Sequence, residues 1–247
     1  MVLMLAGAAP AARALDLELY ASILAANTVA VDDIASTRVD YAALQNSAPW
    51  ETLIRSLRDS DPAMLATRNE KLAFWINAYN ILAIDLVARH PEIESIRDIG
   101  SLLRPVWKRE AGRVGGQPIS LDEIENGILR KQGEPRMHAA IVCASLSCPS
   151  LRREPFDAAR LDAQLDDAVR RWLASPEKGL RLDRARGVLW LSSIFDWFEA
   201  DFEPGGVLAF VSRYLSDADR AFVETRRPRL EYFNYDWRVN ALAAQPE

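Results

Sequence analysis

The segment from Thr67 to His90 constrains the fold more than any other part of the chain. It is the most hydrophobic segment, and its apolar residues lie nearly all round a helix. A helix on the protein surface would carry a polar face, so this segment predicts a central, buried helix. Pro91 follows directly and is expected to end it.

Shorter elements are expected to pack around this helix. Apolar residues at helical spacing predict further helices at residues 15–25, 42–57, 120–129, 156–173, 193–202 and 206–215. Two hairpins are predicted, around Gly115–Gly116 and around residues 184–186, together with a final strand at residues 230–237. The pattern indicates an α+β fold: a single helix-rich domain over residues 15–247, with a small antiparallel sheet formed by short hairpins.

Residues 1–14 read as a leader. They are small and apolar, and they end in Ala12-Arg13-Ala14, which has the A-x-A pattern of a signal-peptidase site, although no basic residue precedes Arg13. We therefore expect a periplasmic or secreted protein, and a cytoplasmic one if the leader is not a signal. This run is too short to span a bilayer and no later run is long enough, so no stable membrane span is expected.

Composition excludes several classes of protein. The chain is 49% hydrophobic and 26% charged, which is ordinary for a globular protein. The net charge of -5 argues against nucleic acid as a partner, because binding to phosphates requires a basic surface. The two histidines are far apart and no nucleotide-binding motif is present, so we expect neither a metal nor a cofactor.

The stretch from His138 to Pro149 is where we expect chemistry, because it contains both cysteines of the chain. Cys143 or Cys148 is a candidate thiol nucleophile, with His138 as its base. Residues 137–143 have the length of a strand, with a helix as the alternative. In a strand, His138 and Cys143 would point to opposite faces and lie about 16 Å apart. Alternatively, Cys143 and Cys148 form a disulfide, or both are simply buried.

Three other positions could join such a site. Asn77 and Asn80 share one face of the buried helix and need hydrogen-bond partners, either loop backbone or a substrate. Glu125 lies in the first turn of its helix, where acids also favour the helix dipole.

Four motifs in this order resemble the DUF547 family, a family of unknown function, over residues 41–240. They are Phe74-Trp-Ile-Asn-Ala-Tyr-Asn80, residues 119–130, residues 137–149 and Tyr235-Asp-Trp237. The resemblance implies a shared fold and small exported relatives, but no established reaction. It also implies a histidine at the position where this chain has Asn126, whereas Glu125, His138, Cys143 and Cys148 match the family pattern.

Two functions follow as hypotheses. The first is a thiol-dependent hydrolase or transferase acting on an amide or thioester. In it Cys143 or Cys148 is the nucleophile, His138 the base and Glu125 its orienter or a second acid, while Asn77 or Asn80 positions the substrate.

The second is a non-catalytic binding or scaffolding domain with a structural Cys143–Cys148 disulfide. Its groove would be lined by Trp75, Tyr79, Trp197 and residues 232–237. A redox protein is a third possibility. The ligand, whether a small molecule, peptide or protein, and the oligomeric state stay open.

Overall fold

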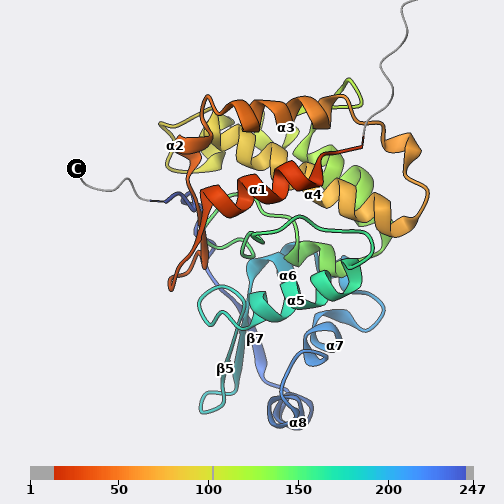
Figure 1. Cartoon of the computed structure of the whole chain (residues 1–247). Helices are drawn as coiled ribbons and strands as arrows, with labels where there is room; N and C mark the ends of the chain where they lie inside the picture. The colour runs from red at the N-terminus through yellow and green to blue at the C-terminus, as the bar shows by residue number, and fades with distance from the viewer. Residues whose placement is uncertain (1–13, 102, 243–247) are drawn as a thin grey trace, which may run out of the picture.

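The computed structural model describes residues 14–101 and 103–242 (Figure 1). Its α-helices are α1 (Leu17–Asn27), α2 (Tyr41–Leu44), α3 (Ala48–Arg58), α4 (Arg68–Ala88), α5 (Leu161–Leu173), α6 (Ser193–Trp197), α7 (Gly206–Ser212) and α8 (Asp217–Arg226). Its strands are β1 (Thr28–Ala30), β2 (Thr37–Val39), β3 (Glu110–Val114), β4 (Gln117–Ser120), β5 (Leu180–Asp183), β6 (Val188–Leu191) and β7 (Arg229–Tyr232). The expected leader lies outside the described residues, except for Ala14.

Short 3-10 turns and one wide π-helix link these elements. The 3-10 turns are η1 (Pro62–Met64), η2 (Ile96–Ile99), η3 (Val106–Lys108), η5 (Arg130–Gln132), η6 (Pro135–Ala139) and η7 (Glu199–Phe202), and the π-helix is η4 (Glu123–Leu129). Helices with small hairpins make this an α+β fold, as the sequence predicted.

Helix α4 is the central element, as its apolar pattern predicted. Every residue from Leu72 to Ala88 is buried except Trp75. A capping box begins the helix: the Thr67 N–H donates to Glu70 at 2.7 Å, and the Glu70 N–H donates to Thr67 Oγ1 at 3.2 Å. These reciprocal bonds satisfy backbone donors that the first turn would otherwise leave without partners.

By length and composition, α4 is also long and apolar enough to cross a membrane, although the sequence predicts no stable span. Among the described residues it is the one helix that meets this test. However, 83% of its most apolar window is buried inside the protein. The apolar surface of α4 is therefore covered by protein, which is the property of a core helix.

The strands form three small sheets. Antiparallel pairing joins β1 to β2, β3 to β4 and β5 to β6. Strand β7 pairs with β6 in parallel, with Leu189 opposite Leu230. This parallel strand departs from the expected all-antiparallel arrangement, because the chain returns to β6 only after α6, η7, α7 and α8.

Two hydrophobic clusters form the core. The larger one surrounds α4 and includes side chains from α1 and α3, which lie with α4 in the upper half of Figure 1. The smaller one includes residues of α5, β6, α6 and α7, which lie in the lower half. Tyr235 packs against both clusters, so the segment after β7 lies where they meet.

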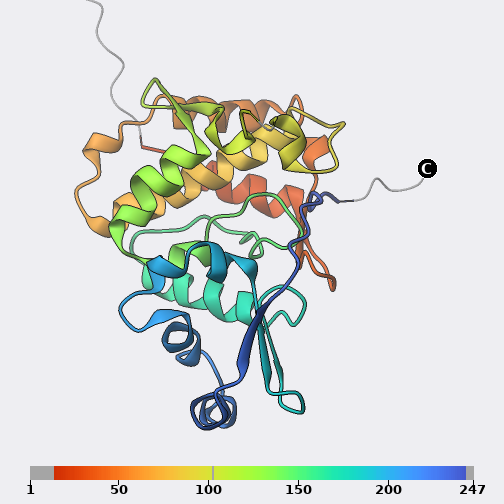
Figure 2. The same ribbon diagram turned by 180° about the vertical axis from the view of Figure 1, so that it is seen from behind.

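The C-terminal segment ties the two halves together. Figure 2 shows it rising from β7 at the bottom toward the helices at the top. Along this path Val239 bridges Ser145, Arg238 bridges Ser95 and Ala241 bridges Val39. The segment therefore passes directly over the loop that carries the cysteines.

Several local predictions were wrong. The helix expected at 42–57 is split into α2 and α3, because Asn46 adopts a positive φ of 63° and Ser47 caps a new helix. Of the last strand, expected at residues 230–237, only residues 230–232 lie in a sheet, as part of β7. Helix α8 and the pair β1–β2 were not predicted.

The strand expected at residues 137–143 is also absent. Pro135 begins the 3-10 turn η6, and an irregular chain follows it. Asn80 explains why no neighbouring strand is needed: its side-chain amide donates to the Ala140 carbonyl at 3.0 Å and accepts from the Val142 N–H at 2.8 Å. Backbone groups that a sheet would satisfy are satisfied by one side chain.

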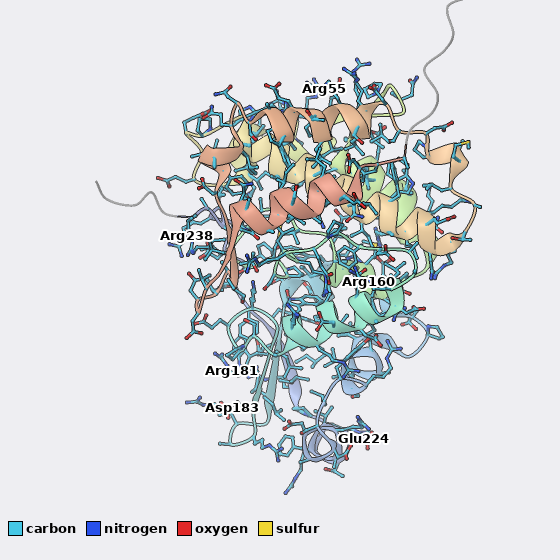
Figure 3. All side chains as sticks on the ribbon, viewed as in Figure 1. Arg55, Arg160, Arg181, Asp183, Glu224 and Arg238 are labelled. Carbon is cyan, nitrogen blue, oxygen red and sulfur yellow. A yellow bond between two sulfur atoms is a disulfide. The ribbon has the colours of Figure 1, made fainter. Side chains whose placement is uncertain are left out.

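Charged side chains cover the outside of the molecule. Figure 3 shows Arg55, Arg160, Arg181, Asp183, Glu224 and Arg238 pointing away from the ribbon. Glu224 lies on α8 at the lower end, far from α4.

Candidate functional site

A cavity of about 200 Å³ lies where the two core clusters meet. It collects side chains from six parts of the chain. The lining consists of Tyr79, Trp107, Asp122, Glu125, Asn126, His138, Ile141, Cys143, Cys148, Ile194, Trp197, Phe198, Tyr235 and Trp237. Most of the chemically reactive residues that the sequence singled out therefore lie in one place.

Local structure explains how the acidic side chains reach this cavity. Ser120 and Glu123 form a capping box, with the Ser120 N–H donating to Glu123 at 2.8 Å and the Glu123 N–H donating to Ser120 Oγ at 3.1 Å. The helix then widens into the π-helix η4. Asp122, Glu125 and Asn126 all line the cavity from this short segment. Wide turns of this kind often accompany functional sites.

Cys143 and Cys148 form a disulfide, with their Cα atoms 6.2 Å apart. The loop between them turns tightly. The Cys143 N–H donates to Cys148 Sγ at 3.0 Å, and Ala144 adopts a positive φ of 62°. Both cysteines line the cavity. Because neither carries a thiol in this bonded form, neither can act as a nucleophile until the bond is reduced.

The C-terminal segment fixes the cysteine loop from outside. Leu146 N–H donates to the Arg238 carbonyl at 2.8 Å, and the Asn240 N–H donates to the Ala144 carbonyl at 2.9 Å. The Tyr235 hydroxyl lies 3.1 Å from Cys148 Sγ and 3.3 Å from Cys143 Sγ. Burial raises the pKa of Tyr235 above its usual range, so the hydroxyl stays protonated and donates a hydrogen bond toward the sulfurs.

Glu125 is the cavity residue whose protonation is most altered. Burial raises the pKa of Glu125 to about 7, and the hydrogen bond from Tyr79 opposes that effect only in part. The Tyr79 hydroxyl lies 3.4 Å from Glu125 Oε2. A carboxyl group with a pKa near neutrality can hold or release a proton at physiological pH, as a general acid or base must.

His138 is engaged by a carboxylate from a distant part of the chain. Its Nε2 lies 2.8 Å from Asp201, which also accepts two bonds from Arg130, at 2.6 and 2.7 Å. The ring stacks on Phe198, with centroids 4.5 Å apart. A carboxylate only accepts, so Nε2 carries the proton and Nδ1 is left as the basic nitrogen.

The pKa values of His138 and Asp201 are both lowered, which keeps the pair as a neutral imidazole beside a carboxylate anion. Burial lowers the pKa of His138, and the hydrogen bond to Asp201 compensates incompletely. Burial would raise the pKa of Asp201, but the hydrogen bonds from His138 and Arg130 outweigh it and hold that pKa well below its usual range. His138 is thus neutral and available as a base near pH 7.

The two asparagines of α4 do not line the cavity. Asn77 donates to the Phe156 carbonyl at 2.8 Å and accepts from its N–H at 2.9 Å. Asn80 binds Ala140 and Val142 in the same way. Both amides are thus occupied by loop backbone, the structural alternative to substrate binding, whereas Tyr79 between them does line the cavity.

Aromatic rings form one continuous wall. Trp197 stacks on Trp237 at 5.6 Å, Tyr235 contacts Trp237 at 4.4 Å, and Trp107 contacts Trp237 at 6.0 Å. Trp197 keeps 46% of its surface exposed, which is high for so large an apolar side chain. Trp75, which we also expected in a groove, packs against Phe74 instead.

Two important residues escaped sequence analysis. Asp201 belongs to no motif that would mark it, and Trp107 lies at the end of a segment that reads as loop. One signal in the sequence did point to this part of the cavity, namely Asn126 at the position where the family resemblance implies a histidine. Asn126 lies on the cavity wall, donates to Asp122 at 2.9 Å and accepts from Arg130 at 2.7 Å.

Within residues 14–101 and 103–242, no group of three or more His, Cys, Asp or Glu side chains is arranged to hold a metal ion.

Comparison with known families adds one match. Residues 63–173 match the family described as "Protein of unknown function, DUF547". Neither the curated proteins nor the solved structures yielded a match. The matched range includes α4, η4 and both cysteines, whereas Asp201, Trp197 and the C-terminal aromatic residues lie beyond it.

Proposed function

We propose that this chain, which carries a domain of the DUF547 family, is a ligand-binding protein whose Cys143–Cys148 disulfide is a structural part of its binding cavity. We also propose that it acts outside the cytoplasm, since disulfides persist in oxidising compartments.

The disulfide is the observation that carries this proposal. It occupies both sulfurs and receives the Tyr235 hydroxyl. The loop around it is bonded to the C-terminal segment through Leu146, Ser147 and Asn240. A cysteine that serves as a nucleophile needs a free thiolate and access to its substrate. Here the sulfurs instead fix one wall of the cavity.

The composition of the cavity supports binding. Apolar and aromatic side chains dominate, and a few polar groups, namely Asp122, Glu125 and Asn126, converge on it. This combination is typical of sites for small ligands. The volume of about 200 Å³ fits a small molecule or the end of a larger one.

A fragment screen by NMR tests the proposal. We expect fragments at millimolar concentration to shift the indole N–H signals of Trp107, Trp197 and Trp237. The Trp197→Ala variant should lose this response. Trp190→Ala is the matched control, because Trp190 lies on β6, stacks on Phe233 and does not line the cavity. A broad screen that shifts none of the three cavity tryptophans would refute the proposal.

A second candidate is a thiol-dependent hydrolase or transferase that acts when the disulfide is reduced. It is favoured by one observation: His138, paired with Asp201, shares the cavity with both sulfurs. A neutral imidazole could then take the proton of a cysteine thiol, and Glu125 could act as a second acid.

Thiol labelling separates the two candidates. If the second holds, reduced protein should react with an iodoacetamide probe at one cysteine at least about tenfold faster than free cysteine does at pH 7. The Cys143→Ser and Cys148→Ser variants identify that cysteine, and His138→Gln should remove the acceleration. Labelling of both cysteines at the rate of free cysteine would exclude this candidate.

A further inference from the structure

The charged side chains that line the cavity are acidic. Two carboxyl groups, Asp122 and Glu125, line it, whereas none of its lining residues is Lys or Arg. Arg130 is the nearest cation along η4 and η5, and its guanidinium makes a two-point salt bridge with Asp201. The lining therefore offers negative charge to whatever enters.

The aromatic wall has the same preference. The face of an aromatic ring is electron-rich and attracts cations within about 6 Å of its centre. Trp107, Trp197, Tyr235 and Trp237 line the cavity as one connected cluster. Arg97 already lies over the Trp237 ring at 5.2 Å, although Arg97 itself does not line the cavity.

We propose that the cavity binds a small organic cation of the alkylammonium class, held against Trp197, Tyr235 and Trp237 with Asp122 and Glu125 as its counter-charges. This inference rests on the proposed binding function and specifies the ligand. Aromatic faces with a nearby carboxylate are the combination that recognises quaternary and alkylated ammonium groups.

The state of Glu125 agrees with this ligand. Glu125 is partly buried near the Asp122 carboxyl group, and desolvation raises its pKa to about 7 although Arg130 and the hydrogen bond from Tyr79 oppose that effect. A bound ammonium group would add positive charge beside this carboxyl group and favour its ionised form. The volume of about 200 Å³ suits an ammonium head with several methyl groups rather than a long chain.

Three probes of nearly identical shape test the charge directly. They are choline, its neutral isostere 3,3-dimethylbutan-1-ol, and the anion 3,3-dimethylbutanoate. Binding to the full-length oxidised protein is measured at pH 8 by titration of the tryptophan indole NMR signals. We expect choline to bind about tenfold tighter than the alcohol, and the anion to bind weakest.

Variants of the carboxyl groups identify the counter-charge. Glu125→Gln should reduce the preference for choline over the alcohol to about threefold or less, and Asp122→Asn serves as a second variant should the first fold poorly. Glu224→Gln, on the exposed face of α8, removes a charge far from the cavity and should leave the preference unchanged.

The outcomes separate this inference from the broader one. If the alcohol or the anion shifts the cavity tryptophans at the same concentration as choline, the proposal of a cationic ligand is wrong while the binding function stands. Choline that binds without shifting Trp197 or Trp237 also refutes the inference. If no probe binds but fragments do, the ligand class is wrong; if fragments fail as well, the binding function falls too.

Discussion

The Tyr235 hydroxyl lies 3.1 Å from Cys148 Sγ, although 87 residues separate the two in the sequence. The same hydroxyl is 3.3 Å from Cys143 Sγ. One phenol from the C-terminal segment therefore serves both sulfurs of a disulfide that belongs to the family-matched part of the chain. The C-terminal segment, which lies outside the family-matched range, thus supplies a hydrogen-bond donor to the cysteine loop.

Replacing Tyr235 with Phe tests this relationship. The variant removes one buried hydroxyl and its hydrogen bonds while keeping the ring against Trp197 and Trp237. We expect the free energy of unfolding to fall by about 1 kcal/mol, measured by urea denaturation. Tyr232→Phe on β7 is the control and should change stability by less than about 0.5 kcal/mol. An equal effect of both variants would mean that the hydroxyl contributes nothing specific.

Reduction of the disulfide should destabilise the protein only modestly. The bond closes a loop with a sequence separation of 5. Cross-linking so short a loop removes little entropy from the unfolded chain, so we expect a loss of about 2 kcal/mol. For a chain of this size, that corresponds to a fall in Tm of about 4–8 °C, measured by calorimetry with and without reductant. An unchanged Tm, together with a mass showing two free thiols before reduction, would contradict the bonded state.

Asn80 should be among the most sensitive positions of α4. Its buried amide satisfies the Ala140 carbonyl and the Val142 N–H, and Asn80→Ala leaves both backbone groups without partners. We expect a loss of about 2–4 kcal/mol in unfolding free energy. Replacement of the exposed Gln45 with Ala is the matched control for loss of an amide side chain, with an effect of less than about 0.5 kcal/mol. A loss below about 1 kcal/mol for Asn80→Ala would show that water replaces its bonds.

Acid should weaken the fold through Asp201 and His138. The folded pKa of Asp201 lies below its unfolded value, so its contribution to stability is present above about pH 4 and is lost as the pH falls further. His138 also has a lowered folded pKa, so its contribution fades as the pH falls below about 6.5. Asp201→Asn should flatten the stability profile below pH 4, as measured by urea denaturation across pH. A profile as steep as that of the parent would contradict this.

Glu125 should give the opposite dependence. Burial raises its folded pKa to about 7, so the folded state favours the protonated carboxyl, and stability is lost as the pH rises from about 4.5 through 7. Glu125→Gln should therefore raise unfolding free energy at pH 8 by about 2 kcal/mol and by much less at pH 4.

The pH dependence of choline binding tests the Glu125 carboxyl group in a second way. Affinity for choline should increase as the pH rises through about 7, because the carboxylate attracts the cation and the protonated form does not. The groups that act on Glu125 are Tyr79, Asp122, Arg130 and Asp201, while Tyr235 and His138 share its cavity. Because the pKa of each tyrosine lies above the usual range and His138 is neutral, none of these three gains or loses charge as the pH rises from 7 to 8. A choline affinity independent of pH in the parent would exclude Glu125 as the counter-charge.

Local sequence signals were reliable where neighbours in the chain decide the structure. The all-round apolar pattern predicted α4, and Gly115–Gly116 made the expected turn of the β3–β4 hairpin. The spacing of Cys143 and Cys148 allowed a disulfide as one alternative, and that bond is present. In each case the interacting groups are within a few residues of each other, so periodicity and turn chemistry suffice.

The segment around His138 shows where such signals fail. Its apolar residues have the pattern of a strand, but no partner strand lies beside it. Asn80 from α4 satisfies the backbone groups of residues 140 and 142 instead. The expected separation of His138 and Cys143 on opposite faces of a strand therefore does not apply, and both line one cavity.

The sequence by itself determined the central helix, the α+β class and the residues worth attention: Tyr79, Glu125, His138 and the two cysteines. The tertiary structure alone decided how they are used. It placed Asp201 against His138 across 63 residues, brought Tyr235 to the sulfurs, and removed Asn77 and Asn80 from the cavity by giving their amides backbone partners. The physical reason is the range of the interactions. Caps, turns and periodicity act between near neighbours in the chain, whereas a cavity, its charges and its pKa values arise only when distant segments are packed together.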